Sequence, residues 1–340
     1  MFIRYLLLVL LISTSLHAAL PIEDDAVFVR VIDSGPGLAT ITRMPGGHYM
    51  VYDAGHWFGE DETMQGIADV MGTDDVIDLM VISHSDSDHT KAVRKILETY
   101  TVKRIIRGGF NRGGPDTWKD ANSAMWEALS NGTQVINLKY FDFPMGATYK
   151  LGETYITMVS GFDEPPDEWG ITDAGERLNS PSIVIRLFFK GKSILYTGDA
   201  VGRHRGDPVD SIIATEKFMV DNSVVIPIDS DVLIAPHHGA DNGSSTDFIK
   251  AVSPEWVILP AGHAHQHPYR VTAQRYLDNG VAIDKILRTD IGDHEKDQHG
   301  NHKEWEHGRI IDQIDPRGDD SIDILIRPTG EVLVEYTVAH

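Results

Sequence analysis

A dense group of metal-binding residue types follows a short apolar run near residue 80. The run Leu79–Ile82 is followed by Ser83, His84, Ser85, Asp86, Ser87, Asp88 and His89. In an extended segment alternate side chains share a side, so His84, Asp86 and Asp88 are expected to face one way. His89 then turns away as a helix starts. A polar loop in which Asp88 caps that helix is the plainer interpretation, but it explains neither histidine. The pattern predicts a metal-binding loop.

Two other polar segments carry candidate ligands after apolar runs. Asp199 follows the strand-like segment 193–196, and the pair His237 and His238 follows Val232–Ala235. Two divalent ions need about six to eight protein donors and a shared water or carboxylate. The first loop supplies four, Asp199 can bridge both ions, and one of His237 and His238 completes a set of six. A water shared by such ions loses a proton near neutral pH and attacks an ester or amide centre.

The residue types narrow the choice of metal. The chain has no cysteine, so its ligands must come from His, Asp and Glu. Three imidazoles and three carboxylates form a harder set than an all-histidine site. Two divalent ions are therefore expected, with zinc as the first choice and manganese as the alternative.

Buried strands precede each of these loops and must position them. A three-stranded meander opens the chain at residues 27–52, and helical and strand-like patterns then alternate as far as residue 138. A hairpin over residues 183–196 leads to Asp199. Because α/β folds place ligands at strand ends, we expect an α/β protein with two packed sheets and helices outside.

Composition limits the partners. The chain has 340 residues, 41% of them hydrophobic, and a formal net charge of −21. This charge favours solubility and opposes binding to a polyanion, so nucleic acid is disfavoured as a partner, although it is not excluded. A small-molecule or phosphoester substrate is expected instead, and nothing in the sequence indicates a partner protein.

The N-terminal segment has the pattern of an export signal. Arg4 precedes a short apolar core, and small residues end it at Ala18 and Ala19. Residues 1–19 are therefore predicted to be a signal peptide that directs the protein to the periplasm or outside the cell. An uncleaved anchor is the alternative, and no later segment is apolar enough to insert stably in a membrane. We expect a hydrolase domain over 20–295, and over 296–340 a His-rich loop and β-hairpin packed on it.

The order of motifs resembles that of a known family. The motifs are Asp53-Ala54-Gly55, the His-x-Asp-x-Asp-His of 84–89, Asn179-x-x-Ser182, Thr197-Gly198-Asp199, Pro236-His237-His238-Gly239 and Arg288-Thr289-Asp290. This order resembles the metallo-β-lactamase superfamily, in the branch with the C-terminal domain of the competence protein ComEC and the pneumococcal phosphorylcholine esterase. The resemblance implies a four-layer αββα sandwich with a dinuclear site at one edge.

The resemblance also implies a role for each residue. It gives two overlapping ligand sets, His84, Asp86 and Asp199 for one ion, and Asp88, His89, Asp199 and His238 for the other. His237 is expected to bind or protonate the substrate, and it forms the expected catalytic group with Asp199 and Asp88. His267, Asn179 and Ser182 are the expected substrate-binding residues, although Asn179 and Ser182 could simply pin their loop.

Two departures from the family pattern bear on the substrate. Asp86 stands where most lactamase-type members have histidine, and the usual third-motif histidine is replaced by the segment with Asn179 and Ser182. Both argue against antibiotic hydrolysis. We therefore expect an exported dinuclear hydrolase acting as a phosphodiesterase or related phosphoester hydrolase through a metal-bridging hydroxide. The alternatives are hydrolysis of lactam, lactone or thioester bonds, or a non-catalytic metal-binding protein of the cell envelope.

Several other polar residues have a structural interpretation beside a functional one. Asp53 is expected to hydrogen-bond the backbone of the metal loop rather than to bind metal. Arg107 and Arg112 could meet a phosphate or face solvent, and His263 and His265 could line the pocket or lie on the surface. The remaining histidines are expected in a solvated loop, at positions 294, 299, 302 and 307.

Overall fold

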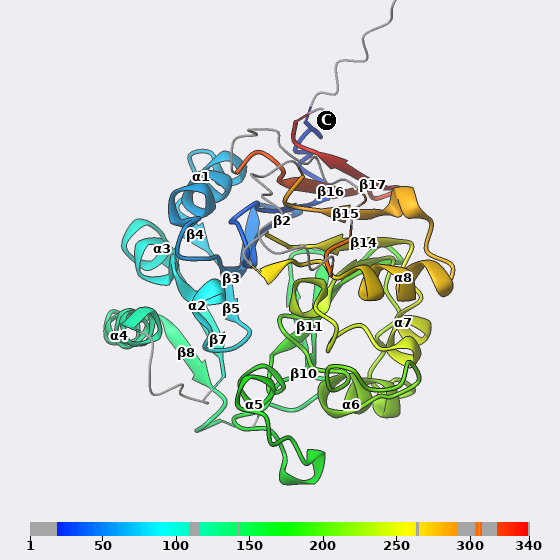
Figure 1. The fold of residues 1–340 in the computed structure, drawn as a ribbon. Helices are drawn as coiled ribbons and strands as arrows, with labels where there is room; N and C mark the ends of the chain where they lie inside the picture. The colour runs from blue at the N-terminus through cyan, green and yellow to red at the C-terminus, as the bar shows by residue number, and fades with distance from the viewer. Residues whose placement is uncertain are drawn as a thin grey trace, which may run out of the picture.

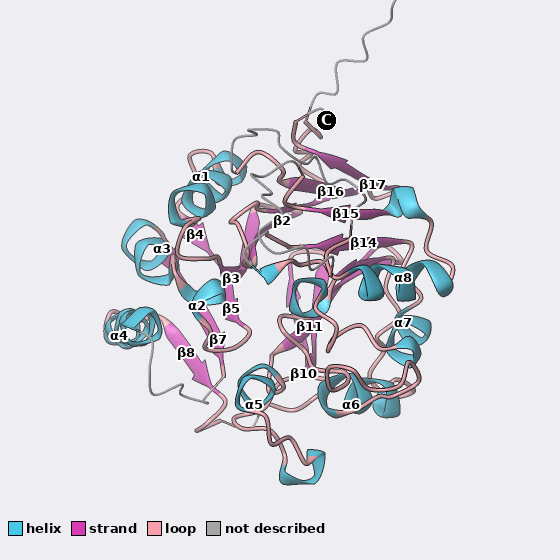
Figure 2. Cartoon of the chain, in the orientation of Figure 1, coloured by secondary structure: helices cyan, strands magenta, loops and turns pink. Residues whose placement is uncertain are grey.

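Two packed β-sheets with helices on their outer faces make up the protein (Figures 1 and 2). The computed structural model describes residues 19–108, 116–141, 143–262, 265–291, 303–305, 307 and 318–338. Residues 1–18 of the expected signal peptide therefore lie outside the described residues, as do Arg112, His263 and the histidines at 294, 299 and 302.

The first sheet has the strand order β17-β16-β1-β2-β3-β5-β7-β8. Its strands are β1 (Val27–Val31), β2 (Ala39–Met44), β3 (His48–Ala54), β5 (Leu79–Ile82), β7 (Arg104–Arg107), β8 (Gln134–Asn137), β16 (Ile322–Ile326) and β17 (Val332–Tyr336). Pairing is antiparallel from β17 to β3 and parallel from β3 to β8. The carboxyl ends of β3, β5 and β7 thus share one edge of the sheet.

The second sheet has the order β15-β14-β13-β12-β11-β10-β9. Its strands are β9 (Thr148–Leu151), β10 (Thr154–Ser160), β11 (Val184–Phe189), β12 (Lys192–Tyr196), β13 (Val232–Ile234), β14 (Trp256–Leu259) and β15 (Ile286–Arg288). Pairing is antiparallel from β9 to β12 and parallel from β12 to β15. A separate two-stranded sheet pairs β4 (Val76–Ile77) with β6 (Thr101–Val102).

Helices cover the outer face of each sheet. The first sheet is covered by α1 (Glu60–Met71), α2 (Ser87–Thr90), α3 (Val93–Thr99) and α4 (Asp116–Ser130), seen on the left of Figure 1. The second is flanked by α6 (Ala214–Asn222), α7 (Thr246–Val252) and α8 (Arg270–Asp278), seen on the right of Figure 1, whereas α5 (Ala174–Asn179) lies at the bottom of the view. The predicted four-layer αββα sandwich is confirmed.

Side chains alternate between the two faces of a strand, and this alternation decides which residues form the core between the sheets. In β1, Val27, Val29 and Val31 face the space between the sheets, whereas Phe28 faces the helices. β5 is buried on both faces, which explains its uninterrupted apolar sequence. Each such side chain, fully removed from water, stabilises the fold by about 1.5–3 kcal/mol.

The C-terminal hairpin contributes two strands to the first sheet. β16 lies between β1 and β17, and it pairs with β1 over five residues from Val27↔Ile326 to Val31↔Ile322. Arg30 and Asp323 are direct partners in this register, and their side chains form two hydrogen bonds of 2.7 and 2.9 Å.

Among the described residues, no helix combines the length and apolar character that a membrane span requires.

Replacing Ile324 by alanine should lower the free energy of unfolding by about 2–5 kcal/mol, because the side chain is fully buried between the sheets. Urea unfolding with a chelator present measures the effect without a contribution from bound metal. Val338→Ala, at a site that is 44% exposed, is the control and should change stability by no more than about 0.5 kcal/mol. Equal effects of the two substitutions would contradict a contribution of the buried face of β16 to stability.

Candidate metal centre

Six candidate ligands converge at one edge of the sandwich, beyond the carboxyl ends of β5, β12 and β13. His84 follows β5 and Asp199 follows β12. His238 lies in a 3₁₀ turn, η2 (Pro236–Gly239), directly after β13. Gly198 allows the loops to approach, because a Cβ there would lie 2.6 Å from the Cβ of Ser83.

The local structure of the first loop corrects one prediction. α2 begins at Ser87, and its N-cap is Asp86, which makes no capping hydrogen bond through its side chain. Asp88 therefore lies inside the helix, and its predicted role as the cap is wrong. The extended segment ends at Asp86, so Asp88 reaches the site from the first turn of α2, beside His89.

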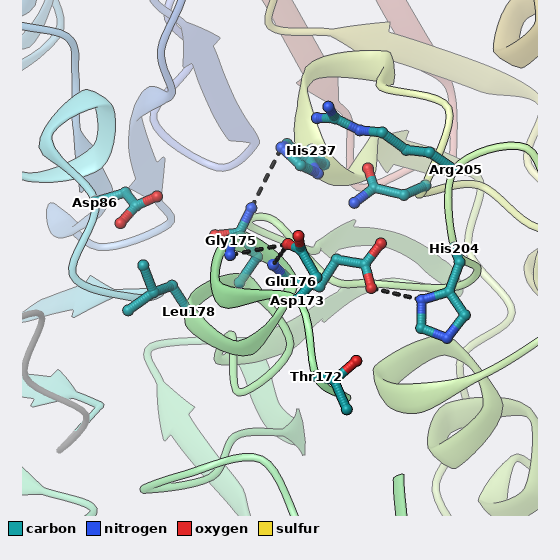
Figure 3. Close-up of a pocket in the computed structure, with 11 residues that line it drawn as sticks. Asp86, Thr172, Asp173, Gly175, Glu176, Leu178, His204, Arg205 and His237 are labelled. Atoms are coloured by element: carbon teal, nitrogen blue, oxygen red, sulfur yellow. Dashed lines mark hydrogen bonds and ion pairs between the residues drawn. The ribbon is translucent and has the colours of Figure 1, made fainter. Parts of the chain in front are cut away.

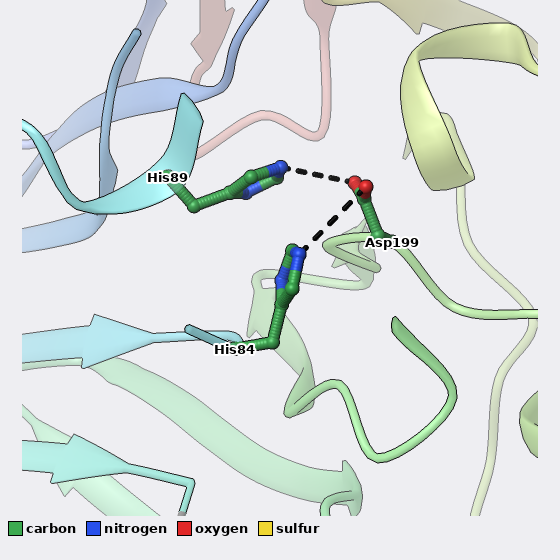
Figure 4. Close-up of side chains that lie close together, drawn as sticks. All are labelled: His84, His89 and Asp199. Carbon is green, nitrogen blue, oxygen red and sulfur yellow. Dashed lines mark ion pairs between the residues drawn. The ribbon is translucent and has the colours of Figure 1, made fainter. Parts of the chain in front are cut away.

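The carboxylate of Asp199 lies at the centre of the cluster (Figure 4). Its Oδ1 lies 3.1 Å from His89 Nε2 and 3.4 Å from His238 Nε2. Its Oδ2 lies 3.8 Å from His84 Nε2 and 3.5 Å from His237 Nε2. The two oxygens of one side chain thus face two different sets of histidines.

The two remaining carboxylates extend these sets. Asp86 Oδ2 lies 3.9 Å from His84 Nε2, and Asp88 Oδ2 lies 3.7 Å from His238 Nε2. Potential ligand atoms lie within 4.8 Å of one another in two groups, one of His84, His89 and Asp199 and one of Asp88, His89 and His238. The structure therefore brings together all six side chains expected to bind metal.

Groups behind the rings determine which nitrogen faces the centre. His89 Nδ1 donates to Asp53 Oδ2 at 2.8 Å, and His238 Nδ1 donates to the carbonyl of Pro260 at 2.7 Å. The hydroxyl of Ser83 donates to Asp53 at 2.7 Å and can therefore accept from His84 Nδ1 at 2.9 Å. All three rings present the lone pair of Nε2 to the centre, which is how metal-binding histidines are usually oriented.

Asp53 holds the metal loop as the sequence predicted. Besides its contact with His89, it accepts a hydrogen bond of 2.7 Å from the backbone N–H of Ser83, so its interpretation as a structural acid is confirmed. Its φ of 58° is left-handed, as are those of His237 (50°) and His238 (55°). Such conformations cost about 1–3 kcal/mol each and persist where the surroundings enforce them.

The arrangement fits divalent cations. Nε2 of His89 and Nε2 of His238 lie 3.1 Å apart, although both atoms carry lone pairs in the tautomers described above. The buried atoms His84 Nε2 and Asp199 Oδ1 have no hydrogen-bond partner among the described residues. Buried polar atoms without partners are costly, and a cation placed among them removes that cost.

The electrostatics favour positive charge in the same place. Burial alone would raise the pKa of Asp199, but the imidazoles of His89 and His238 outweigh it and hold that pKa well below its usual range. Burial would lower the pKa of His89, but the carboxylates of Asp199 and Asp53 raise it well above the usual value. At His237 burial dominates and lowers the pKa.

The three expected substrate-binding residues surround the cluster but differ in access. Nδ2 of Asn179, at the end of α5, lies 3.4 Å from Asp199 Oδ2 and 3.3 Å from His237 Nε2. Ser182 is fully buried and accepts a hydrogen bond of 3.2 Å from the backbone N–H of Asp199, so it fixes that loop. The ring of His267 stacks on that of His238 at 6.1 Å.

A cavity of about 460 Å³ opens beside Asp86, Asn179 and His237 (Figure 3). Its far wall contains residues that the sequence analysis missed, namely Glu176, His204 and Arg205. His204 Nδ1 lies 2.6 Å from Glu176 Oε2, whereas Arg205 is exposed and extends toward His237. The sequence could have indicated them only by their position, in polar segments shortly before and after Asp199.

Three other candidates lie away from the cluster. Arg107 is buried in β7, with its guanidinium 4.8 Å from the ring centre of Trp118, and burial lowers its pKa to about 10. It packs in the interior, so it neither meets solvent nor lines the cavity. His265 is exposed, and its ring centre lies 5.9 Å from that of His267. His307 is exposed beside Trp305, as expected for a solvated segment.

Comparison with known proteins identifies the family. The model of the metallo-beta-lactamase superfamily matches residues 32–263. The chain belongs to this superfamily. With this fold and its buried His/Asp clusters, it is a metal-dependent hydrolase of the superfamily. The resemblance inferred from the motif order is confirmed.

Two distant relatives place it in the ComA/ComEC-like branch of the superfamily. The competence protein ComA of Neisseria gonorrhoeae is 25% identical over 287 residues, which are 79% of this chain and 32% of ComA. ComE operon protein 3 of Bacillus subtilis (strain 168) is 23% identical over 216 residues, 63% of this chain and 24% of that protein. The chain thus spans less than a third of the length of either relative.

Solved structures with a similar chain path include two metalloproteins. CmlA, a diiron beta-hydroxylase from Streptomyces venezuelae, is 14% identical, with 79% of this chain and 53% of CmlA covered and a TM-score of 0.47. Igni18, a metallo hydrolase from Ignicoccus hospitalis, is 15% identical, with 78% of this chain and 97% of Igni18 covered and a TM-score of 0.45. At these values neither comparison bears on the reaction of this member of the superfamily.

Replacing Asp53 by asparagine should weaken zinc binding by about 10–100-fold, because the substitution removes the carboxylate that orients His89. Asparagine tolerates the left-handed backbone at this position, so the loop should keep its shape. Competition with a chromophoric chelator measures the affinity. Asp284→Asn, at an exposed site before β15, is the control, and unchanged affinity in Asp53→Asn would contradict the orienting role.

Proposed function

We propose that the protein is a dinuclear metal-dependent phosphoester hydrolase, and specifically a phosphodiesterase. The observation that carries the proposal is the position of Asp199, whose Oδ2 faces His84 and whose Oδ1 faces His89 and His238. One carboxylate can bridge two ions about 3.5–4 Å apart, which is the spacing of two-metal hydrolase sites.

On this proposal, the candidate ligands are divided between two ions. His84, Asp86 and one oxygen of Asp199 would hold the first, and Asp88, His89, His238 and the other oxygen would hold the second. Zinc suits this mixture of imidazole and carboxylate, and manganese is the competitor. When bound, the ions supply activation of water and neutralisation of charge at the reacting centre.

The chain's own groups around the cavity suit a negatively charged reacting centre. His237 and Asn179 lie on the side of Asp199 Oδ2, at the mouth of the cavity, and both offer polar atoms to a bound oxygen. Because burial lowers the pKa of His237, its ring is neutral near pH 7 and can position a substrate oxygen or accept a proton. Arg205 adds a cation to the same cavity.

Charge and compartment complete the proposal. A net charge of −21 disfavours a long polyanion, so the substrate is a small phosphoester. The sequence of the first 19 residues supports export to the periplasm or beyond, with the mature protein free of the membrane.

Zinc-loaded protein should hydrolyse bis-(p-nitrophenyl) phosphate, and Asp199→Ala should reduce the turnover by at least about 1000-fold, because it removes the group shared by both sets of ligands. A chelator should abolish the activity and added zinc should restore it. Asp284→Ala, at the opposite ends of the strands, is the matched control and should keep full activity.

The same preparation separates the competing functions. Turnover of nitrocefin or a lactone without turnover of any phosphoester would move the assignment to C–N or C–O hydrolysis. Two bound metal ions without any turnover would make the protein a metal-binding component of the envelope.

A further inference from the structure

A second cavity, of about 430 Å³, adjoins the first and shares Arg205 with it. Arg270 and Lys303 line its other side, and Tyr269 and Asp241 complete the wall. We call this second cavity the basic groove.

The basic groove is cationic in a protein that is otherwise strongly acidic. Arg205, Arg270 and Lys303 are exposed, and none forms an ion pair with a residue in the described part of the chain. The one acid in the wall, Asp241, is held by Arg275 at 2.9 Å and by Arg203 at 3.7 Å. Within the described part of the chain, the three cations therefore carry no ion pair that would compete with an external anion.

A buried network holds two of these cations side by side. The backbone N–H of Arg270 donates to the carbonyl of Lys303 at 2.7 Å, and the neighbouring residues Tyr269 and Glu304 form an antiparallel bridge. The carboxylate of Glu304 accepts from the buried guanidinium of Arg288 at 2.6 Å. The segment that carries Lys303 is thus fixed to the body of the second sheet.

The groove begins close to the metal ligands. The ring of His267 lies 6.1 Å from that of His238 on one side and 5.0 Å from that of Tyr269 on the other. Lys303 Nζ lies 5.9 Å from the centre of the Tyr269 ring. Two ring contacts and one cation–ring contact therefore connect a metal ligand with Lys303.

We propose that the basic groove binds a second phosphate, carried by the substrate next to the phosphoester that is hydrolysed. The proposal rests on the function proposed above and specifies its substrate class as an organic bisphosphate. A phosphate presents several charged oxygens, and guanidinium groups bind such oxygens in pairs. A substrate whose only phosphate lies at the metal centre would leave the three cations of the basic groove without a bound anion.

Binding of matched ligands tests the groove without depending on turnover. Calorimetry with the zinc-loaded full chain compares thymidine 3′,5′-bisphosphate with thymidine 5′-monophosphate, which differ by one phosphate. The bisphosphate should bind at least about tenfold more tightly, since hydrogen bonds to charged groups have this strength. Equal affinities for the two ligands would overturn the proposal.

Substitution locates the effect. In the double variant Arg270→Gln, Lys303→Gln the affinity ratio of the two ligands should fall close to one, because both side chains are exposed and their loss removes charge rather than packing. Lys119→Gln, at an exposed site on α4, is the control and should keep the ratio of the parent protein. A preference that survives in the double variant would place the second phosphate elsewhere and overturn the proposal.

Turnover of bis-(p-nitrophenyl) phosphate, which has no second phosphate, reports separately on the proposed function. Turnover by the parent protein together with equal binding of the two thymidine ligands would retain the hydrolase and reject the groove. A binding preference that the double variant loses, without any phosphoester turnover, would reject the hydrolase and retain the groove as a bisphosphate site.

Discussion

The carboxylate of Asp199 is surrounded by Nε2 atoms of four histidines, all within 3.8 Å. Ring nitrogens that converge in a buried space repel one another unless positive charge lies among them. The neighbouring elements maintain this convergence, because the ends of β5, β12 and β13 deliver the side chains and groups behind the rings fix the inward nitrogen. The fold acts as a frame that holds these ligands close together.

That frame has a local cost that the rest of the molecule offsets. Asp53, His237 and His238 all have left-handed backbone conformations, and none of them is a glycine. Asp53 lies near the end of β3, and His237 and His238 lie in η2 directly after β13. Both strands are buried, so these conformations cannot relax without disturbing the core. Preorganisation of this kind suits a metal centre, since ligands that are already positioned lose little conformational freedom on binding.

Much of the centre can be predicted from the sequence, because each ligand follows a short apolar run, and such runs form strands whose ends share an edge. The prediction fails where tertiary contacts decide. Asp88 is not the cap of α2, because the helix begins one residue before it, at Ser87. The cavity wall combines Glu176 of the short helix α5 with His204 and Arg205 of a polar loop, and their meeting depends on tertiary contacts such as that of His204 with Glu176. Likewise, the pattern of β16 predicts a strand but does not name β1 as its partner.

The pairing of β1 with β16 also sets the order in which the protein can be assembled. Arg30 and Asp323 are separated by 293 positions along the chain, yet they lie opposite each other in one ladder. Contacts this remote in sequence form late, since the intervening chain must be ordered first. During synthesis β1 emerges long before its partner and waits with an unpaired edge. The first sheet can therefore be completed only after all strands of the second sheet have been synthesised.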